Sequence, residues 1–400
     1  MCGIGLGVVG VAACAYLSRR RRPSDAESTR FPRPPPPQSP SATRRKRGPS
    51  WTRRHSALVL SAALCFLALS TALRAWQFTP TPPIDEAAQV ARACGCASFA
   101  CLRSAFATPS SYFKVPHFWI GGGQKCGTTT LYATLARHPQ IMAPEPKEPG
   151  YFAWPAPARL AAERWYVRDA LRLGDACDRG LGKVATFDGT AYYLQWGGPV
   201  ARALKASAPW AKIVLVFREP VARAMSWLQH MAMKYPAIPS CLHHRPMDCC
   251  VQQSWFLSGV HHLGGSKYYK HLKDWIDAGW RVDDDIHVVR FEQMIESPRG
   301  FRDAYRAILD FLGLDPGPAA NMTRDDTQPA NRRSVVPYNV SRRAYEAMVD
   351  EVRQDAANLE ELLGVDFGWH RYWARQLAQC DRDRLCRVPL LPPPLSVRTL

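Results

Sequence analysis

Short apolar runs alternate with amphipathic segments through the middle of the chain. The apolar runs at 115–120, 184–187, 213–217 and 287–290 predict buried strands. Apolar residues at helical spacing predict helices at 128–137, 200–208, 220–233, 268–278, 300–311 and 342–363. Alternation of this kind predicts an α/β fold, with a parallel sheet that helices cover on both faces.

Two hydrophobic stretches precede this region, at 1–17 and 56–73. The second is about long enough to span a thin bilayer, and the arginines before it predict a type II signal anchor with the rest of the chain in the lumen. The first, rich in Gly and Ala, is a marginal second span, an organellar address or a gene-model extension. The basic, Pro-rich segment 18–55 is expected to be disordered and cytoplasmic. Residues 74–113 are expected to form a stem, 114–375 the catalytic domain and 376–400 a C-terminal tail.

The charge of the chain is unevenly distributed. Segment 18–55 holds twelve Lys or Arg and two acidic residues, a local charge of +10, so +8 of the formal net charge of +18 remains for the other residues. Much of the basic excess therefore belongs to a cytoplasmic flank and not to a nucleic-acid-binding face.

Thirteen cysteines, several of them clustered, predict disulfides formed in an oxidising lumen. Zinc binding is the alternative, but the clusters lack paired Cys-x-x-Cys spacing, and no metal is expected. The sequons at Asn321 and Asn339 agree with a lumenal glycoprotein.

A glycine-rich turn, GGGQKCGTTT at 121–130, follows the first predicted strand and leads into the first predicted helix. Backbone N–H groups and the helix dipole favour an anion there, and Lys125 adds a full positive charge. A Walker A loop would place its lysine after the second glycine, whereas Lys125 precedes Gly127. The residues expected to bind the anion are Gln124, Lys125, Cys126, Gly127, Thr128 and Thr129.

This Lys-x-Gly-Thr-Thr order resembles the 5′-phosphosulfate loop of sulfotransferases that use 3′-phosphoadenosine 5′-phosphosulfate (PAPS). From about residue 115 to 369 the sequence is similar to Golgi-type carbohydrate sulfotransferases, closest in pattern to N-acetylgalactosamine 4-sulfate 6-O-sulfotransferases. The resemblance implies the sulfotransferase fold and PAPS as the sulfuryl donor. It also implies a late donor-binding loop at 328–339, with Arg332 and Arg333 as phosphate ligands.

A second motif, KIVLVFREPVARAMSW at 212–227, ends a predicted strand at Arg218 and places Ser226 on the next helix. It resembles the 3′-phosphate motif of the same family. A guanidinium suits this role because two of its N–H groups match two phosphate oxygens, and the serine adds a neutral donor. The alternative is a helix-capping ion pair between Arg218 and Glu219 or a neighbouring residue.

A third motif, PEPKEPGYFAW at 144–154, resembles the family's Lys-Glu-Pro-His-Phe-Phe segment. The resemblance implies that Glu148 is the general base that takes the proton of the acceptor hydroxyl. Gly150 stands where that family often has histidine, and in isolation an exposed loop glutamate would be the simpler interpretation. The residues expected near the substrate are Lys147, Asp188 and Thr190, with Asp188 the next candidate for the base.

These motifs together predict a Golgi, single-span, PAPS-dependent sulfotransferase that acts on a hydroxyl of a glycan, with a glycosaminoglycan-like polysaccharide as the main candidate. A small-molecule or lipid acceptor remains an alternative. A nucleotide phosphotransferase would carry a Lys-Ser/Thr pair after the last loop glycine and a strand-end aspartate for magnesium, whereas Thr128 follows Gly127 and Arg218 ends a strand. A non-catalytic, membrane-tethered glycan-binding protein would have no use for Glu148 as a base.

Overall fold

The computed structural model describes residues 85–107, 112–234, 247–322, 338–383 and 385–389. The predicted anchor at 56–73, the segments at 1–17 and 18–55, and the residues Arg332 and Arg333 lie outside these ranges. Among the described residues, no helix combines the length and the apolar character that a membrane span needs.

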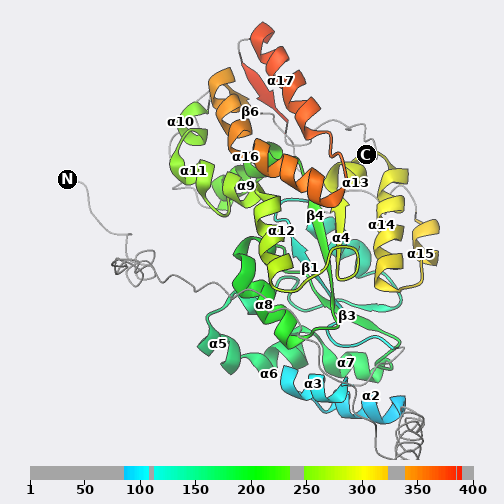
Figure 1. Ribbon diagram of the computed structural model, residues 1–400. Coiled ribbons are helices and arrows are strands. Elements are labelled where there is room, and N and C mark those ends of the chain that lie inside the picture. Colours follow the sequence, from blue (N-terminus) through cyan, green and yellow to red (C-terminus); the bar gives the residue numbers. More distant parts are fainter. Residues whose placement is uncertain (1–84, 108–111, 235–246, 323–337, 384, 390–400) are drawn as a thin grey trace, which may run out of the picture. The chain divides into compact units, whose positions relative to one another are not determined.

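Five parallel strands form the central sheet, in the order β2–β3–β1–β4–β5. Figure 1 labels β1, β3 and β4 of this sheet. Their bounds are β1 Phe118–Gly122, β2 Ile141–Met142, β3 Ala185–Asp188, β4 Lys212–Phe217 and β5 Ile286–Arg290. The prediction of a parallel sheet is confirmed. β1 continues through Gly121 and Gly122, where we expected the glycines to end the strand. β2 was not predicted, because two residues are too few to show a period.

Helices connect the strands and surround the sheet. The longer ones are α4 Thr128–Leu135, α8 Gly197–Ser207, α9 Pro220–Lys234, α12 Tyr268–Asp277, α14 Pro298–Leu312, α16 Arg342–Leu363 and α17 Trp369–Asp383. The shorter elements are α2 Glu86–Cys94, α3 Phe99–Ala105, η1 Tyr151–Ala153, α5 Ala156–Ala161, α6 Glu163–Trp165, η2 Tyr166–Ala170, α7 Leu173–Asp178, η3 Leu194–Trp196, α10 Asp248–Val251, α11 Ser254–Ser258, η5 Leu263–Ser266, α13 Phe291–Glu296 and α15 Gly317–Ala320. All six predicted helices are present, with their ends moved by at most three residues.

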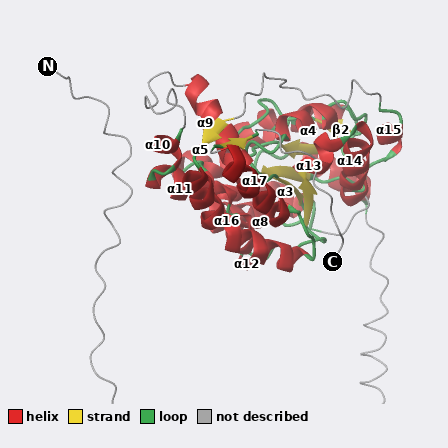
Figure 2. Cartoon of the chain, turned by 90° about the horizontal axis from the view of Figure 1, so that it is seen from above, coloured by secondary structure: helices red, strands yellow, loops and turns green. Residues whose placement is uncertain are grey.

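Helices pack around the strands of the sheet (Figure 2), and the sheet separates two apolar cores. In β1, Phe118 and Ile120 face the core formed with α4, α13 and α14, whereas Trp119 faces the core formed with α8, α12 and α16. β4 alternates in the same way, because successive side chains of a strand point to opposite faces. A sheet buried on both faces explains why its strands read as continuous apolar runs in the sequence.

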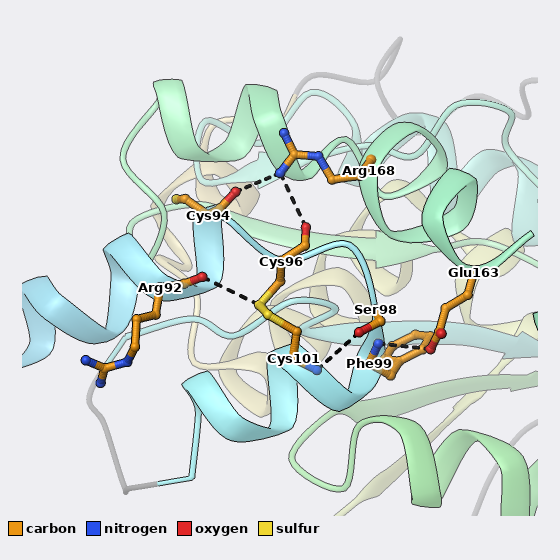
Figure 3. Close-up of a disulfide and its surroundings, with 8 residues drawn as sticks. All are labelled: Arg92, Cys94, Cys96, Ser98, Phe99, Cys101, Glu163 and Arg168. Carbon is orange, nitrogen blue, oxygen red and sulfur yellow. Dashed lines mark hydrogen bonds between the residues drawn. A yellow bond between two sulfur atoms is a disulfide. The ribbon is translucent and has the colours of Figure 1, made fainter.

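The region expected to form a stem contains two helices. α2 and α3 fall within 74–113, yet Phe99 and Leu102 of α3 are buried in the core beside α8. The side chain of Ser98 caps α3 by accepting from the backbone N–H of Cys101 (Figure 3). Residues 85–107 therefore belong to the folded unit, because the apolar surface of α3 is covered by the catalytic domain.

Disulfides hold this N-terminal segment in place. Cys94 of α2 is bonded to Cys177 of α7, and Cys96 is bonded to Cys101 across the turn before α3. The Arg168 guanidinium donates to the carbonyls of Cys94 and Cys96, at 2.7 and 3.4 Å (Figure 3). These bonds make α2 and α3 a fixed support for the helices after β2.

A long helix crosses the predicted domain boundary at residue 375. This helix, α17, buries Trp369 and Trp373. A disulfide joins Cys380 of α17 to Cys386 of β7 (Cys386–Val388), which pairs antiparallel with β6 (Tyr338–Val340). α17 escaped prediction because most of its residues are polar.

Candidate functional site

The carboxyl ends of the five strands meet at one edge of the sheet, and each is followed by predicted or newly found site residues. The turn at 123–129 follows β1, the Glu148 loop follows β2, and Asp188 ends β3. Arg218 follows β4, and α13 follows β5. Ligands of open parallel α/β sheets bind at this edge, so the topology brings the three predicted motifs to one place.

The turn after β1 presents the N-terminus of α4. Gly127 occupies the N-cap with φ 82°, and α4 begins without a side-chain hydrogen bond at this cap. A Cβ at Gly127 would stand 3.0 Å from the ring of Phe291, so both the backbone conformation and the close packing require glycine. Because the first N–H groups of a helix have no partner within it, this end of α4 suits an anion.

Arg218 joins this turn to β4. Its Nη1 donates to the carbonyl of Lys125 at 2.7 Å, and its guanidinium lies 4.6 Å from the ring centroid of Phe291. The residue is only 4% exposed, and burial lowers the pKa of its guanidinium. Its Nε has no hydrogen-bond partner among the described residues.

Glu219 does not form the ion pair that we weighed as an alternative for Arg218. Its carboxylate accepts the backbone N–H groups of Val221 and Ala222, at 2.9 and 2.6 Å, and therefore caps α9. It also accepts from Trp373 Nε1 at 2.7 Å, which ties α17 to the same strand end. Arg218 is thus left to face the turn after β1.

Two residues outside the predicted set support this side of the site. The Tyr268 hydroxyl donates to the Arg218 carbonyl at 2.9 Å and lies 3.6 Å from Cys126 Sγ. Burial raises the pKa of the Cys126 thiol to about 11, so this thiol stays protonated at neutral pH. Arg223 is fully buried and donates to the Ser266 hydroxyl at 2.7 Å. An arginine inside the apolar face of a predicted helix could have revealed the role of Arg223, whereas no sequence signal indicates the role of Tyr268.

Glu148 lies on the loop after β2 in an ion pair with Lys147. Their side chains are 34% and 24% exposed, so both can be reached from solvent. Burial raises the pKa of the Tyr192 hydroxyl, and the nearby carboxylates of Glu148 and Asp188 raise it further. The loop after β3 therefore lies next to the predicted base.

Gly150 departs from the family pattern for a steric reason. Its φ is +69°, and the hydroxyl of Tyr192 occupies the space that a Cβ would need. A histidine at this position would be strained in the backbone and would collide with Tyr192.

Asp188 and Thr190 are buried under the Glu148 loop. The Asp188 carboxylate accepts four hydrogen bonds, from the backbone N–H and hydroxyl of Thr190 and from the hydroxyls of Tyr166 and Tyr193. Burial raises the pKa of Asp188, while the four donors act in the opposite direction. Protein donors thus occupy this fully buried carboxylate, and the role of Asp188 and Thr190 toward the substrate stays a prediction.

The segment 189–194 contacts both halves of the site. A Cβ at Gly122 of the first half would stand 3.1 Å from the Ala191 carbonyl and 2.9 Å from Leu194 Cβ. In the second half, the Gly150 N–H donates to the Thr190 hydroxyl at 3.0 Å. The turn that carries Lys125 and the loop that carries Glu148 thus flank one segment.

The other predicted donor residues occupy the expected elements. Thr128 is buried and Thr129 half-buried in the first turn of α4, and Ser226 is half-buried on α9. In the part of the chain that the structure describes, no cluster of three or more His, Cys, Asp or Glu side chains could hold a metal ion.

Comparison with known proteins identifies the class of the domain. Residues 200–334 match the family model of the sulfotransferase domain. This part of the chain is similar to sulfotransferase domains. The matched range includes Arg218 and Ser226 of the second motif and ends just after Arg333. The prediction of a sulfotransferase is confirmed at the level of the domain class.

Among curated proteins, the mouse heparan sulfate glucosamine 3-O-sulfotransferase 3B1 is 28% identical over 214 residues, which are 53% of this chain and 49% of that protein. The human bifunctional heparan sulfate N-deacetylase/N-sulfotransferase 2 is 26% identical over 210 residues, 51% of this chain and 22% of that protein. The chain thus spans about half the length of the first of these relatives and less of the second. A crystal structure of a sulfotransferase from Alicyclobacillus acidocaldarius aligns with a TM-score of 0.45 at 24% identity, covering 64% of this chain and 99% of that one. The closeness to N-acetylgalactosamine 4-sulfate 6-O-sulfotransferases stays a prediction.

Proposed function

We propose that the protein transfers the sulfuryl group of PAPS to a hydroxyl of a glycosaminoglycan of the heparan sulfate type. One observation carries the proposal: an uncapped helix N-terminus with Lys125 and a solvent-accessible carboxylate, Glu148, flank the same segment at the carboxyl edge of the sheet. Sulfuryl transfer needs positive charge at the leaving phosphate and a base at the attacking hydroxyl. The acceptor class follows the names of the curated relatives.

The donor half would hold PAPS by its two phosphate ends. The N–H groups at the start of α4 and the Lys125 ammonium take the 5′-phosphosulfate, and Arg218 with Ser226 takes the 3′-phosphate. Two buried polar atoms without a partner among the described residues, Arg218 Nε and Gln124 Oε1, fit a polar ligand at this position. Arg332 and Arg333 complete the donor site in the family pattern.

The reaction would proceed as an in-line displacement. The acceptor hydroxyl oxygen forms a bond to sulfur while the bond between sulfur and the 5′-phosphate oxygen breaks, and Glu148 takes the hydroxyl proton. Lys125 offsets the negative charge that develops on the leaving phosphate, and the products are the sulfated glycan and 3′-phosphoadenosine 5′-phosphate. Lys147, which is paired with Glu148, would meet the negative charges of the acceptor.

The proposed location is the Golgi membrane, with residues 18–55 in the cytosol and the sulfotransferase domain in the lumen. Asn321 is exposed at the C-terminal end of α15, where a glycan can be attached, and Asn339 is half-buried in β6. A glycosidase-sensitive mass on Asn321 is therefore expected in the full chain. Absence of any glycan, together with protease protection of the N-terminal segment, would reverse the topology.

The activity is tested with the full chain, radiolabelled PAPS and a panel of heparan sulfate, chondroitin sulfate, their desulfated forms and small hydroxyl acceptors. We expect label in the heparan sulfate type of polysaccharide. Label only in chondroitin would move the proposal to the N-acetylgalactosamine enzymes, and label only in small acceptors would overturn the glycan assignment. Wild-type protein that binds PAPS and labels nothing would overturn the proposed activity.

A further inference from the structure

A buried network links Asp188 to the loop that carries Glu148. The carboxylate of Asp188 accepts from three hydroxyl groups, those of Thr190 at 2.6 Å and of Tyr166 and Tyr193 at 2.8 Å each. All four side chains are fully buried. The hydroxyls are therefore shielded from water and have fixed partners.

Each of these hydroxyls also accepts one hydrogen bond from another part of the fold. The three pairs are Gly150 N–H to Thr190 Oγ1 at 3.0 Å, Phe152 N–H to the Tyr193 oxygen at 3.2 Å, and Trp119 Nε1–H to the Tyr166 oxygen at 3.3 Å. Two of the three N–H groups belong to the chain immediately after Glu148. The third belongs to β1, the strand that leads to the Lys125 turn.

The charge type of Asp188 sets the direction of every bond in the network. A carboxylate only accepts, so each hydroxyl must point its proton at Asp188 and turn a lone pair toward its N–H partner. An amide at this position would present its own N–H groups to the tyrosines and upset that order. The network therefore needs an acidic residue, although the residue is closed to substrate.

We propose that Asp188, acting through Thr190 and Tyr193, positions the Glu148 loop for proton transfer, so that Asp188 and Thr190 are positioning residues without a contact to the acceptor. The inference rests on the proposed role of Glu148 as the base. It gives the two residues a place in the reaction that matches their burial. A base must lie within hydrogen-bond reach of the proton it removes, and a displacement of about 1 Å can cost about a hundredfold in rate.

The N-terminal segment packs against the same network. The ring of Phe99 in α3 lies 5.9 Å from that of Tyr166 and 5.7 Å from that of Phe152, measured between centroids. Its N–H donates to Glu163 at 2.9 Å (Figure 3). The disulfide-bonded segment before the sheet thus packs against the loop that carries Glu148.

The test compares Thr190→Val with a matched control four residues earlier in the chain, Thr186→Val in β3. Both threonines are fully buried, but Thr186 Oγ1 has no hydrogen-bond partner among the described residues, whereas Thr190 Oγ1 links Gly150 to Asp188. In the full chain with PAPS and heparan sulfate, Thr190→Val should lower kcat about ten- to a hundredfold with little change in either KM. Thr190→Ser keeps the oxygen and should restore most of kcat, and Thr186→Val should behave like wild type.

A double-mutant cycle with Glu148→Gln separates positioning from other roles. If Thr190 acts through Glu148, adding Thr190→Val to Glu148→Gln should slow transfer by less than about threefold, because no base is left to misplace. A full additional loss, an increase in acceptor KM at unchanged kcat, or equal effects of Thr190→Val and Thr186→Val would each overturn the inference. Wild-type protein without sulfuryl transfer would instead overturn the proposed function.

Discussion

The two halves of the site are built by different means. In the donor half, Arg218 and Tyr268 donate to backbone carbonyls, and every residue type offers such a carbonyl. In the acceptor half, Asp188 binds the side chains of Thr190 and Tyr193, so each position needs a particular residue type. Substitutions should therefore separate donor binding from proton transfer.

The largest effect is expected at the predicted base. Glu148→Gln keeps the shape of the side chain but cannot take a proton at neutral pH, so transfer should fall about a hundred- to ten-thousandfold. Binding of PAPS, measured by calorimetry, should persist because the donor half is intact. Sulfuryl transfer in a single turnover measures the chemical step directly.

Glu145→Gln is the matched control, because Glu145 is an exposed carboxylate on the same loop. It should transfer sulfate at the wild-type rate. If Glu148→Gln instead loses PAPS affinity and keeps its turnover at saturating donor, Glu148 belongs to the donor half and the comparison between the halves fails.

The donor half should respond next. Lys125→Ala removes the cation at the leaving phosphate and should lower turnover about a hundredfold or more, as for the loss of one preorganised electrostatic donor. Lys270→Ala, at an exposed position of α12, serves as the charge-matched control and should change little. Normal turnover of correctly folded Lys125→Ala would show that the turn after β1 does not bind the leaving phosphate.

How far each half could be predicted follows from how it is built. The donor turn depends on a local order, Lys125 before Gly127 at the start of a helix, and a local order is visible in sequence. The burial of Asp188 depends on Tyr166, twenty-two residues away along the chain. No periodic pattern indicates such a contact, so Asp188 looked like a substrate ligand.

The fold shows the same division. Helices with a clear apolar face, such as α16, were predicted to the residue, because burial of that face decides where they form. α3 and α17 were missed, since they are held in the core by a few large aromatic side chains, Phe99 in α3 and Trp369 and Trp373 in α17, and not by a long apolar face. The steric demand for Gly150 was equally invisible, because the Tyr192 hydroxyl that requires it comes from another loop.

A smaller effect is expected at Arg218. Arg218→Lys keeps one positive charge but loses the planar fork and the contact with Phe291, so KM for PAPS should rise about ten- to a hundredfold. kcat at saturating donor should change less than KM. A fall in kcat with unchanged KM would place Arg218 with the reacting atoms. The donor half would then not be limited to donor binding.

The smallest effect is expected for Tyr268→Phe, which tests whether the donor half depends on bonds to backbone carbonyls. The substitution keeps the ring, which stacks on Phe217 at 4.4 Å, and removes the hydroxyl that donates to the Arg218 carbonyl. One lost buried hydrogen bond should lower the free energy of unfolding by about 1 kcal/mol, and KM for PAPS should rise about two- to fivefold as Arg218 loosens.

Tyr345→Phe is the control, because the Tyr345 hydroxyl is buried without a hydrogen-bond partner among the described residues. Denaturant unfolding and donor titration should leave Tyr345→Phe unchanged or slightly more stable, since deleting an unpartnered buried hydroxyl removes a desolvated group. Equal losses in the two variants would mean that ring packing, and not the bond to the Arg218 carbonyl, holds the donor half together.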